Sequence, residues 1–198
     1  MKYLIIILSI ITTLGVSPSS NVEDFNTYSA LLPTFTVKAN ILEGFEAKKA
    51  KTRDEVAKLN NSLFTYVARY TVLTKAQAYS LFIQEQGLGS YLYTKHNNPF
   101  NVKASKAQRS TLALTWEYTR DNDVYDSFRS HTTIQDGAEA FVIYFNRRFC
   151  HVKAGTNREV FYNMRYGKDK YGNTIAYHTD QSHWARAKLA DKYEKLNV

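Results

Sequence analysis

The chain has 198 residues, with 26 Lys and Arg against 18 Asp and Glu, a formal net charge of +8 and a pI near 9.4. This length is sufficient for one domain with its own core, and the 14% content of aromatic residues argues against a disordered chain. The positive charge favours a polyanionic partner, such as nucleic acid, anionic lipid or an anionic wall polymer, without choosing among them. The single cysteine, Cys150, excludes an internal disulfide and a cysteine-rich metal site, and we expect it to be a buried small apolar residue.

Residues 1–20 have the pattern of a secretory signal peptide. Lys2 precedes an apolar run from Tyr3 to Val16, and serine and proline follow at 17–20. The apolar run is shorter than the roughly 20 residues that a membrane-spanning helix needs. We therefore expect export, cleavage of this segment and no stable membrane insertion afterwards. Because an Ala-x-Ala cleavage site is missing, an uncleaved membrane anchor is the alternative.

A change of pattern divides the remaining chain into a predicted N-terminal arm or spacer at 21–54 and a domain at 55–198. The arm mixes polar residues with scattered apolar positions and has no regular period. From Val56 to Tyr70 the apolar residues recur every three or four positions, which predicts an amphipathic helix.

A second helix is indicated by its end signals. Thr74 and Gln77 have the spacing of a capping box, and Gly87 follows a run of good helix formers as a stop. The polar stretch 93–105, which contains Pro99, then predicts a loop.

The rest of the chain predicts a small β-hairpin followed by helices. Alternating residues at 112–119 and a short run at 124–128 indicate the two strands. The apolar stripe within 134–149 predicts a core helix, and a last helix is expected from Ser182, with Asp180 or Ser182 as its cap. The predicted fold class is α+β, mostly helical with one small β-hairpin lobe.

Glu85 is the first candidate for chemistry. It continues the apolar stripe of the predicted second helix and lies in the last turn before Gly87. Partial burial and the negative end of the helix dipole both favour the protonated carboxyl group. Cleavage of a glycosidic bond requires such a proton donor. The alternative is an ordinary surface residue at a helix end, beside Lys95 or Lys103.

Glu117 is a second carboxylate, on the polar face of the predicted hairpin. Together with Glu85 it would flank a cleft; a wide gap would favour inversion through a bound water, and a close pair would favour retention. The pattern alone does not distinguish this role from that of an ordinary solvated strand residue. Asp121, Asp123 and Asp126 are equally available.

Other chemistries have weaker support. The histidines lack the spacing of a metal site, so we expect no metal and no cofactor. Cys150 beside His151 would fit a Cys/His peptidase, but adjacent residues rarely form a catalytic pair. No phosphate-binding glycine-rich loop occurs, and because the basic residues are scattered, nucleic-acid binding rests on net charge alone.

The segment LFIQEQGLGSYLYTKHNNPFNVKA resembles the signature of glycoside hydrolase family 73, the glucosaminidases of autolysins and flagellar wall-cutting enzymes. In that family a helix ends in a pattern like ILESGWG, and a loop with NNLFGIK follows. The matching residues here are IQEQGLG and NNPFNVK, so the resemblance aligns Glu85 with the catalytic acid. YDSF and YHTDQSHWARAKL are similar to two further family segments, and the similarity runs from about residue 56 to the C-terminus.

This resemblance implies a lysozyme-like endo-β-N-acetylglucosaminidase that is secreted or acts in the periplasm or cell wall on peptidoglycan glycan strands. It aligns Tyr177 with the active-site tyrosine and Glu117 with the usual place of a second acid. The implied catalytic residues are Glu85, Glu117 and Tyr177. The implied substrate-binding residues are Asn98, Phe100 and Tyr125. A GLMQ-type motif, typical of lytic transglycosylases, does not follow the acid, which favours hydrolysis.

The sequence departs from the family's motifs at four positions, namely Gln86, Leu88, Pro99 and Asn101. These changes affect the loop geometry and the sugar platform. A wall-binding or virion-associated structural protein that kept the fold without turnover is the alternative function, and both a bacterial and a phage origin fit.

Overall fold

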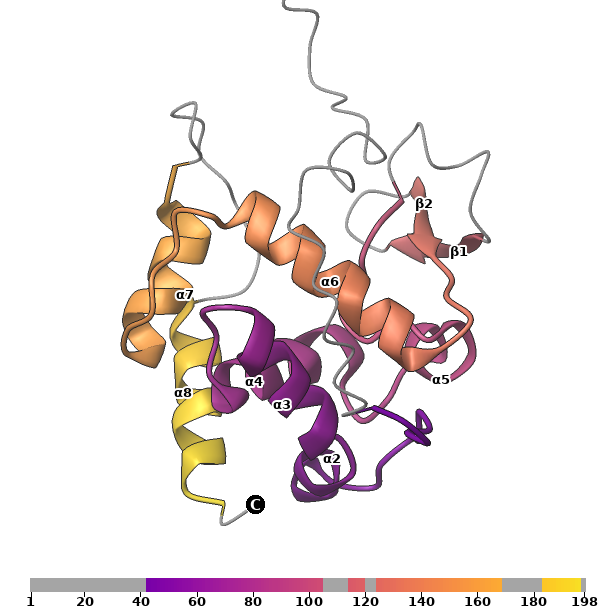
Figure 1. Ribbon diagram of the computed structural model, residues 1–198, viewed down its shortest axis with the longest axis horizontal. Helices are drawn as coiled ribbons and strands as arrows, with labels where there is room; N and C mark the ends of the chain where they lie inside the picture. The colour runs from indigo at the N-terminus through magenta and orange to yellow at the C-terminus, as the bar shows by residue number, and fades with distance from the viewer. Residues whose placement is uncertain (1–41, 105–113, 120–123, 169–182, 197–198) are drawn as a thin grey trace, which may run out of the picture. The chain divides into compact units, whose positions relative to one another are not determined.

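Helices make up most of the structure, in agreement with the predicted fold class. The computed structural model describes residues 42–104, 114–119, 124–168 and 183–196, and within the strands it describes side chains only from Ser127 onward (Figure 1). The predicted signal segment lies outside the described residues. No helix in the described ranges is both long enough and apolar enough to cross a membrane.

The single helix expected from Val56 to Tyr70 is two helices. α2 (Arg53–Leu59) and α3 (Asn61–Tyr70) meet at Asn60, whose side chain is almost completely buried. Its Nδ2 donates to the carbonyl of Val56 at 3.0 Å, and its Oδ1 accepts from the hydroxyl of Tyr93. The apolar period continues across the break, so the periodicity could not reveal it.

α4 (Lys75–Gln86) begins and ends where the sequence predicts. The backbone N–H of Gln77 donates to Thr74 Oγ1 at 3.2 Å, and the N–H of Thr74 donates to Gln77 Oε1 at 3.0 Å, which completes the capping box. Gly87 ends the helix with a φ of +59°, a conformation that glycine adopts without a steric cost.

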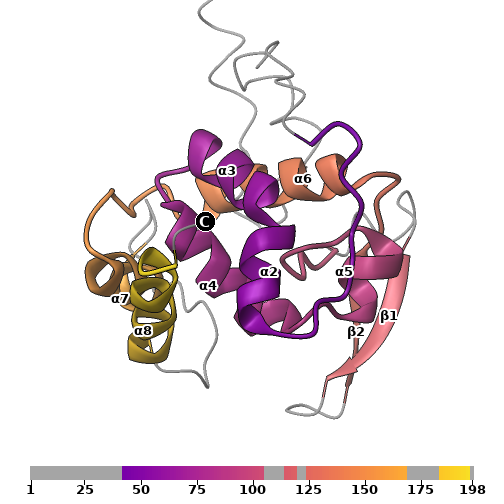
Figure 2. The same cartoon turned by 90° about the horizontal axis from the view of Figure 1, so that it is seen from below.

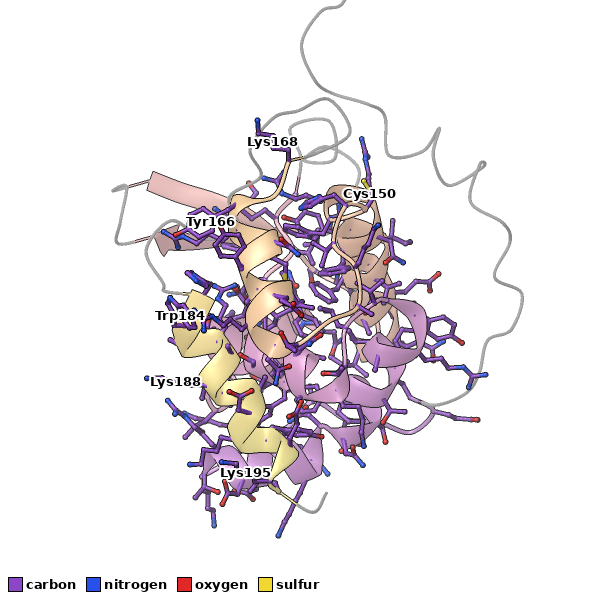
Figure 3. All side chains as sticks on the ribbon, turned by 90° about the vertical axis from the view of Figure 1, so that its left-hand side faces the viewer. Cys150, Tyr166, Lys168, Trp184, Lys188 and Lys195 are labelled. Carbon is purple, nitrogen blue, oxygen red and sulfur yellow. The ribbon has the colours of Figure 1, made fainter. Side chains whose placement is uncertain are left out.

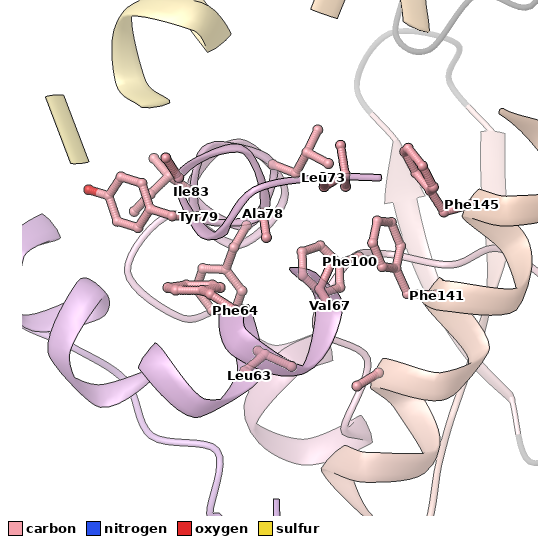
Figure 4. Close-up of a cluster of buried hydrophobic side chains, with 14 of the residues drawn as sticks. Leu63, Phe64, Val67, Leu73, Ala78, Tyr79, Ile83, Phe100, Phe141 and Phe145 are labelled. Carbon is pink, nitrogen blue, oxygen red and sulfur yellow. The ribbon is translucent and has the colours of Figure 1, made fainter. Parts of the chain in front are cut away.

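The core surrounds α4, which packs against α3 on one side and α8 (His183–Glu194) on another. The Phe82 ring packs edge-to-face against Phe64 at 5.7 Å and against Phe100 at 6.2 Å. Phe100 in turn stacks on Phe141 at a centroid distance of 4.0 Å (Figure 4). Such contacts favour defined ring orientations. This aromatic series therefore fixes how the loop after the short helix α5 (Tyr91–His96) packs on the other helices.

The predicted core helix is α6 (Ile134–Arg148), with a capping box formed by Thr133 and Asp136. Gly137 in its first turn lies directly against the loop that follows α5: a Cβ there would come within 1.8 Å of the carbonyl oxygen of Asn97. Only a glycine allows this approach.

α7 (Asn157–Tyr166) is a helix that the sequence interpretation missed, although Thr156 and Glu159 form a capping box at its start. It packs side by side with α8, and both helices lie on the side of the domain away from the strands (Figures 1 and 2). α8 confirms the predicted last helix; its expected caps, Asp180 and Ser182, lie outside the described residues.

Two further expectations are wrong. The stretch predicted as a loop at 93–105 begins inside a short helix, α5 (Tyr91–His96), which Ser90 caps and which Asn97 ends in the left-handed conformation. Cys150 is exposed rather than buried, because it follows the last turn of α6, where Phe149 takes the buried position.

The predicted hairpin is confirmed as β1 (Leu114–Thr119) and β2 (Val124–Arg129), an antiparallel pair with Glu117 opposite Asp126. The end of β2 is joined to the loop after α5. The N–H of Ala104 donates to the carbonyl of Ser127 at 2.9 Å, and the N–H of Arg129 donates to the carbonyl of Val102 at 3.1 Å. We call the helices α2–α4 and α6–α8 the helical body; this loop connects it to the hairpin.

Gly137→Ala should lower the free energy of unfolding by about 1 to 3 kcal/mol, because the added methyl group must push the Asn97 carbonyl away from α6. Chemical denaturation would measure the change. Glu139→Ala, at an exposed position of the same helix, is the matched control and should change stability by about 0.5 kcal/mol or less. Equal stability of the two variants would contradict the close approach.

Candidate active site

Glu85 lies in the last turn of α4, and its side chain is half-buried. The residues before it on the same stripe, Leu81 and Phe82, are completely buried, so the stripe emerges from the core at Glu85. Asn101 Nδ2 donates to the backbone carbonyl of Glu85 at 2.9 Å and to its carboxylate Oε2 at 3.2 Å. One amide group therefore fixes both the helix end and the carboxylate.

A chain of side-chain hydrogen bonds holds Asn101 in this orientation. Gln86 Nε2 donates to Asn101 Oδ1 at 2.7 Å and to the carbonyl of Asn98 at 2.9 Å. The Gln86 Oε1 accepts from the hydroxyl of Ser90. The chain Ser90, Gln86, Asn101, Glu85 thus uses both donors of each amide, and we call it the amide chain. Gln86 is only 4% exposed, so these bonds compete little with water.

The local backbone explains why asparagine fits at position 101. Asn97 and Asn101 both have a positive φ, 49° and 50°, and asparagine tolerates this conformation better than other residues with a Cβ. The left-handed turn at 101 directs the chain back toward the end of α4. The amide of Asn101 consequently meets the Glu85 carboxylate.

Asn98 joins the same loop to β2. Its side chain is completely buried; Nδ2 donates to the carbonyls of Val102 at 3.1 Å and Arg129 at 3.0 Å, and Oδ1 accepts from the N–H of Val102 at 2.9 Å. Phe100 is equally buried in the aromatic series of the core. Both sequence-predicted residues shape the loop from within, since neither presents its side chain to solvent.

Tyr144, on α6, adds a third element to the surroundings of Glu85. Burial raises the pKa of Tyr144; the nearby Arg148 guanidinium acts against this shift, and the Glu85 carboxylate adds to it. Arg129, at the end of β2, also lies within electrostatic reach of Tyr144, and burial lowers the pKa of this guanidinium. Glu85 thus shares its environment with α6 and with the base of the hairpin.

Sequence interpretation did not identify Tyr144, Arg129 or the amide of Asn101 as neighbours of Glu85. Tyr144 lies between two core positions of the α6 stripe, and Arg129 is the last residue of a predicted strand. No sequence pattern therefore distinguishes either residue as part of a functional site. Asn101 and Gln86 did stand out as departures from the family pattern. Two polar residues that replace the family's usual residues together, Gln86 and Asn101, could have predicted a hydrogen bond between their side chains.

The remaining predicted site residues are placed only in part. Glu117 lies on β1 opposite Asp126, and Tyr125 lies on β2 opposite Tyr118. Tyr177 lies outside the described residues. The structure therefore brings together Glu85, Asn98 and Phe100 around one loop, and it joins that loop to the base of the hairpin that contains Glu117.

A hollow of about 360 Å³ lies elsewhere on α4, between α2, α4 and α8. Arg53, Ile83, Gln84, Ala185 and Leu189 line it, and Glu85 is not among them. At 100° per residue Glu85 points away from the side of Ile83. We therefore assign the candidate site to the amide chain and not to this hollow.

The arrangement can support proton transfer. The half-buried Glu85 carboxyl group lies at the C-terminus of a helix and accepts an amide hydrogen bond at Oε2, so it is oriented as a general acid or base requires. Among the described residues no group of three or more His, Cys, Asp or Glu side chains could hold a metal ion.

Two solved structures have a similar fold. A peptidoglycan hydrolase from Sphingomonas sp. A1 has a TM-score of 0.55 at 16% identity, covering 69% of this chain and 88% of its own. The glycoside hydrolase domain of Salmonella typhimurium FlgJ has a TM-score of 0.51 at 13% identity, covering 72% of this chain and 89% of its own. At these identities the likeness shows the fold alone. No protein-family model and no curated protein sequence matches the chain significantly.

Asn98→Ala should destabilise the protein by about 2 to 4 kcal/mol, because it removes three buried hydrogen bonds and leaves the buried N–H of Val102 without its acceptor. Thermal or denaturant unfolding would measure the loss. The control is Asn146→Ala at an exposed α6 position, whose Nδ2 makes one bond, to the carbonyl of Tyr70. A loss no greater than that of the control would contradict the role assigned to Asn98.

Proposed function

We propose that this chain is a peptidoglycan hydrolase, an endo-β-N-acetylglucosaminidase that cleaves the glycan strand with Glu85 as general acid. The observation that carries the proposal is the half-buried Glu85 carboxylate, oriented by Asn101 at the end of a buried helix. The fold shared with a peptidoglycan hydrolase and with a glycoside hydrolase domain supports it. The resemblance to glycoside hydrolase family 73 supports the same bond specificity.

In this proposal the Glu85 carboxyl group protonates the glycosidic oxygen as the bond to the leaving sugar breaks. Asn101 donates to Oε2 and therefore holds the carboxyl group in one orientation during the transfer. After the transfer the carboxylate is negative, and a hydrogen bond to a charged group is stronger than one to a neutral group. The Asn101 amide consequently stabilises the product of the proton transfer without moving.

Glu117 and Tyr177 complete the proposed machinery. Glu117, on the hairpin, would activate a water molecule or stabilise the oxocarbenium-like transition state. Tyr177 would position or polarise groups around the N-acetyl side chain, and Tyr125 would contact the sugar strand. Asn98 and Phe100 act indirectly, by shaping the loop that holds Asn101 against the acid.

The net charge of +8 suits this substrate, since the peptide stems of peptidoglycan carry carboxylates. The signal-like N-terminus fits a protein that acts outside the cytoplasm, in a bacterial wall or in phage-driven lysis. A non-catalytic wall-binding protein is the competing function. It predicts binding without release of muropeptides.

Glu85→Gln should reduce turnover by about 10² to 10⁴ or more, because the amide cannot donate the required proton. Tyr177→Phe should also cost heavily, and Glu117→Gln should cost less than Glu85→Gln. The assay is the release of muropeptides from purified peptidoglycan, with mass spectrometry identifying the new reducing-end sugar. Glu139→Gln, an exposed glutamate on α6, is the control and should retain wild-type turnover.

Folding of each variant would be checked by circular dichroism. A folded Glu85→Gln protein with wild-type turnover would remove Glu85 from the mechanism. Release of fragments ending in N-acetylmuramic acid rather than N-acetylglucosamine would contradict the proposed bond specificity. A wild-type protein that binds peptidoglycan but releases nothing would favour the wall-binding alternative.

Asn101→Asp should move the alkaline limb of the pH profile of kcat/KM to higher pH. A second carboxylate about 3.2 Å from Glu85 Oε2 favours the protonated acid, and a general acid is lost when it deprotonates as the pH rises. Asn101→Gly suits the left-handed backbone and removes the donor to the carboxylate without adding a charge, so it should give a smaller shift in the same direction. Unchanged profiles in both variants would show that Asn101 does not act on the acid.

A further inference from the structure

A second group of charged and aromatic side chains lies on the outer face of α7 and α8, away from the hairpin. Figure 3 faces this side of the domain. Three large aromatic residues are solvent-exposed here: Tyr162 at 51%, Tyr166 at 47% and Trp184 at 39%. They belong to a set that we call the arginine–aromatic cluster, which consists of Arg158, Tyr162, Arg165, Tyr166, His183 and Trp184.

The cluster is tightly organised by its rings. His183 packs edge-to-face against Tyr162 at 5.5 Å and against Tyr166 at 5.4 Å, and its centroid is 5.0 Å from that of Trp184. Tyr162 and Tyr166 are one helical turn apart on α7, with their centroids separated by 4.9 Å. These contacts join the C-terminal half of α7 to the first turn of α8. The exposed surface is therefore rigid.

Arg158 is held in place by this surface. Its guanidinium carbon lies 3.5 Å from the centroid of the Trp184 ring, a stacked cation–π contact. Within the described part of the chain this guanidinium has no hydrogen bond and no ion pair. A stacked guanidinium keeps its in-plane N–H donors directed outward, in the fork that matches a carboxylate. Part of the entropy cost of binding is thus already met by the fold.

The charge around the cluster is mainly positive. Arg165 lies 5.4 Å from the Tyr166 ring, and the positive charges of Arg165 and Arg158 both act, after burial, to lower the pKa of His183. Lys168, Lys188 and Lys195 are on the same side of the domain (Figure 3). Among the described residues, the nearby acids Glu159, Asp191 and Glu194 each accept hydrogen bonds from other parts of the protein.

Two contacts account for those acids. Glu159 accepts from the N–H and the hydroxyl of Thr156 in the capping box of α7. Asp191 and Glu194 both accept from the Asn157 side-chain amide, at 2.8 and 3.1 Å. These hydrogen bonds lie in the first turn of α7, next to Arg158, and among the described residues none of the three carboxylates forms an ion pair with Arg158.

We propose that the arginine–aromatic cluster binds carboxylate-bearing glycan strands at a second site, separate from the one around Glu85. Arg158 and Arg165 bind the carboxylates of the strand, and the exposed rings contact its sugars. The choice of a peptidoglycan strand as ligand rests on the proposed function. Such a strand is long enough to occupy the candidate active site and this cluster together.

Two other polyanions fit the cluster less well. An anionic lipid surface would call for a continuous apolar helix face, and on the described residues of α7 and α8 the exposed rings are interspersed with charged side chains instead. Single-stranded nucleic acid would call for open ring faces on which bases stack, but Arg158 covers a face of Trp184. A glycan with regularly spaced carboxylates uses the arginine fork and needs only partial ring contact.

The test measures binding of the full chain to purified peptidoglycan sacculi by co-sedimentation, in the Glu85→Gln background so that the sacculi stay intact. Arg158→Ala should weaken binding by about five-fold or more, and Arg158→Lys should lose nearly as much, since it keeps the charge without the planar fork. Trp184→Ala should also weaken binding, because it removes the ring that holds Arg158 in place. The double variant Arg158→Ala/Trp184→Ala should therefore bind no worse than either single variant. Arg69→Ala is the matched control: Arg69 is exposed beside the Tyr70 ring on α3, and its loss should change binding by less than about two-fold.

Site occupancy has an independent readout. Addition of muramyl dipeptide should raise the pKa of the His183 imidazole in NMR titrations, because the bound carboxylate offsets the positive charges of Arg158 and Arg165. The same shift should be absent in Arg158→Ala. Parallel binding to single-stranded oligonucleotides and to anionic phospholipid vesicles would identify another ligand class.

The outcomes separate this proposal from the proposed function. Arg158-dependent binding to sacculi that the wild-type protein does not digest would support the second site and contradict the hydrolase activity. Digestion with binding that is equally strong in Arg158→Ala and Arg69→Ala would support the activity and overturn the second site. Arg158-dependent binding to oligonucleotides or vesicles but not to sacculi would also overturn it.

Discussion

The carboxamide of Gln86 is the contact on which the candidate site depends. It is buried at the last residue of α4, and its two donors fasten the loop carbonyl of Asn98 and the side chain of Asn101. Without it nothing described in the structure would select the rotamer of Asn101 that meets Glu85. A buried amide whose partners are all satisfied is stabilising and specific, whereas a partly satisfied one is costly. The orientation of the acid is therefore linked to the stability of the helix end.

Much of the helical framework could be predicted because its signals are local. The capping box at Thr74 and the stop at Gly87 are short-range patterns, and the structure has them where the sequence indicates. The break at Asn60 could not be predicted in this way, since it depends on Tyr93, which is distant in sequence. Neighbours of Glu85 such as Tyr144 and Arg129 come from separate elements that only tertiary packing brings together. The second acid and the tyrosine stay predictions from the resemblance.

The domain has two regions with different electrostatic surroundings, one around Glu85 and one around Arg158. The Glu85 carboxylate is held by the amide of Asn101 within electrostatic reach of the half-buried Tyr144, an environment suited to proton transfer. On α7 and α8 the exposed guanidinium of Arg158 rests on an indole, an environment suited to holding an anion without chemistry. α4 connects the two: its Ser80 hydroxyl donates to the carbonyl of Arg186 in α8, and its last turn carries Glu85. Both regions thus depend on the packing of one buried helix.

The attachment of the hairpin has a mechanical consequence. The bonds described between the helical body and the two strands gather at the base of β2, where the carbonyls of Ser127 and Arg129 and the N–H of Arg129 meet the loop. A two-stranded ribbon that is joined to the helical body at its base bends more easily than a packed helix. Glu85, at the end of α4, therefore lies on the stiffer part of the domain, and the strand that contains Glu117 is more compliant. Bending of the ribbon at its base would change the position of Glu117 while the orientation of Glu85 stays constant.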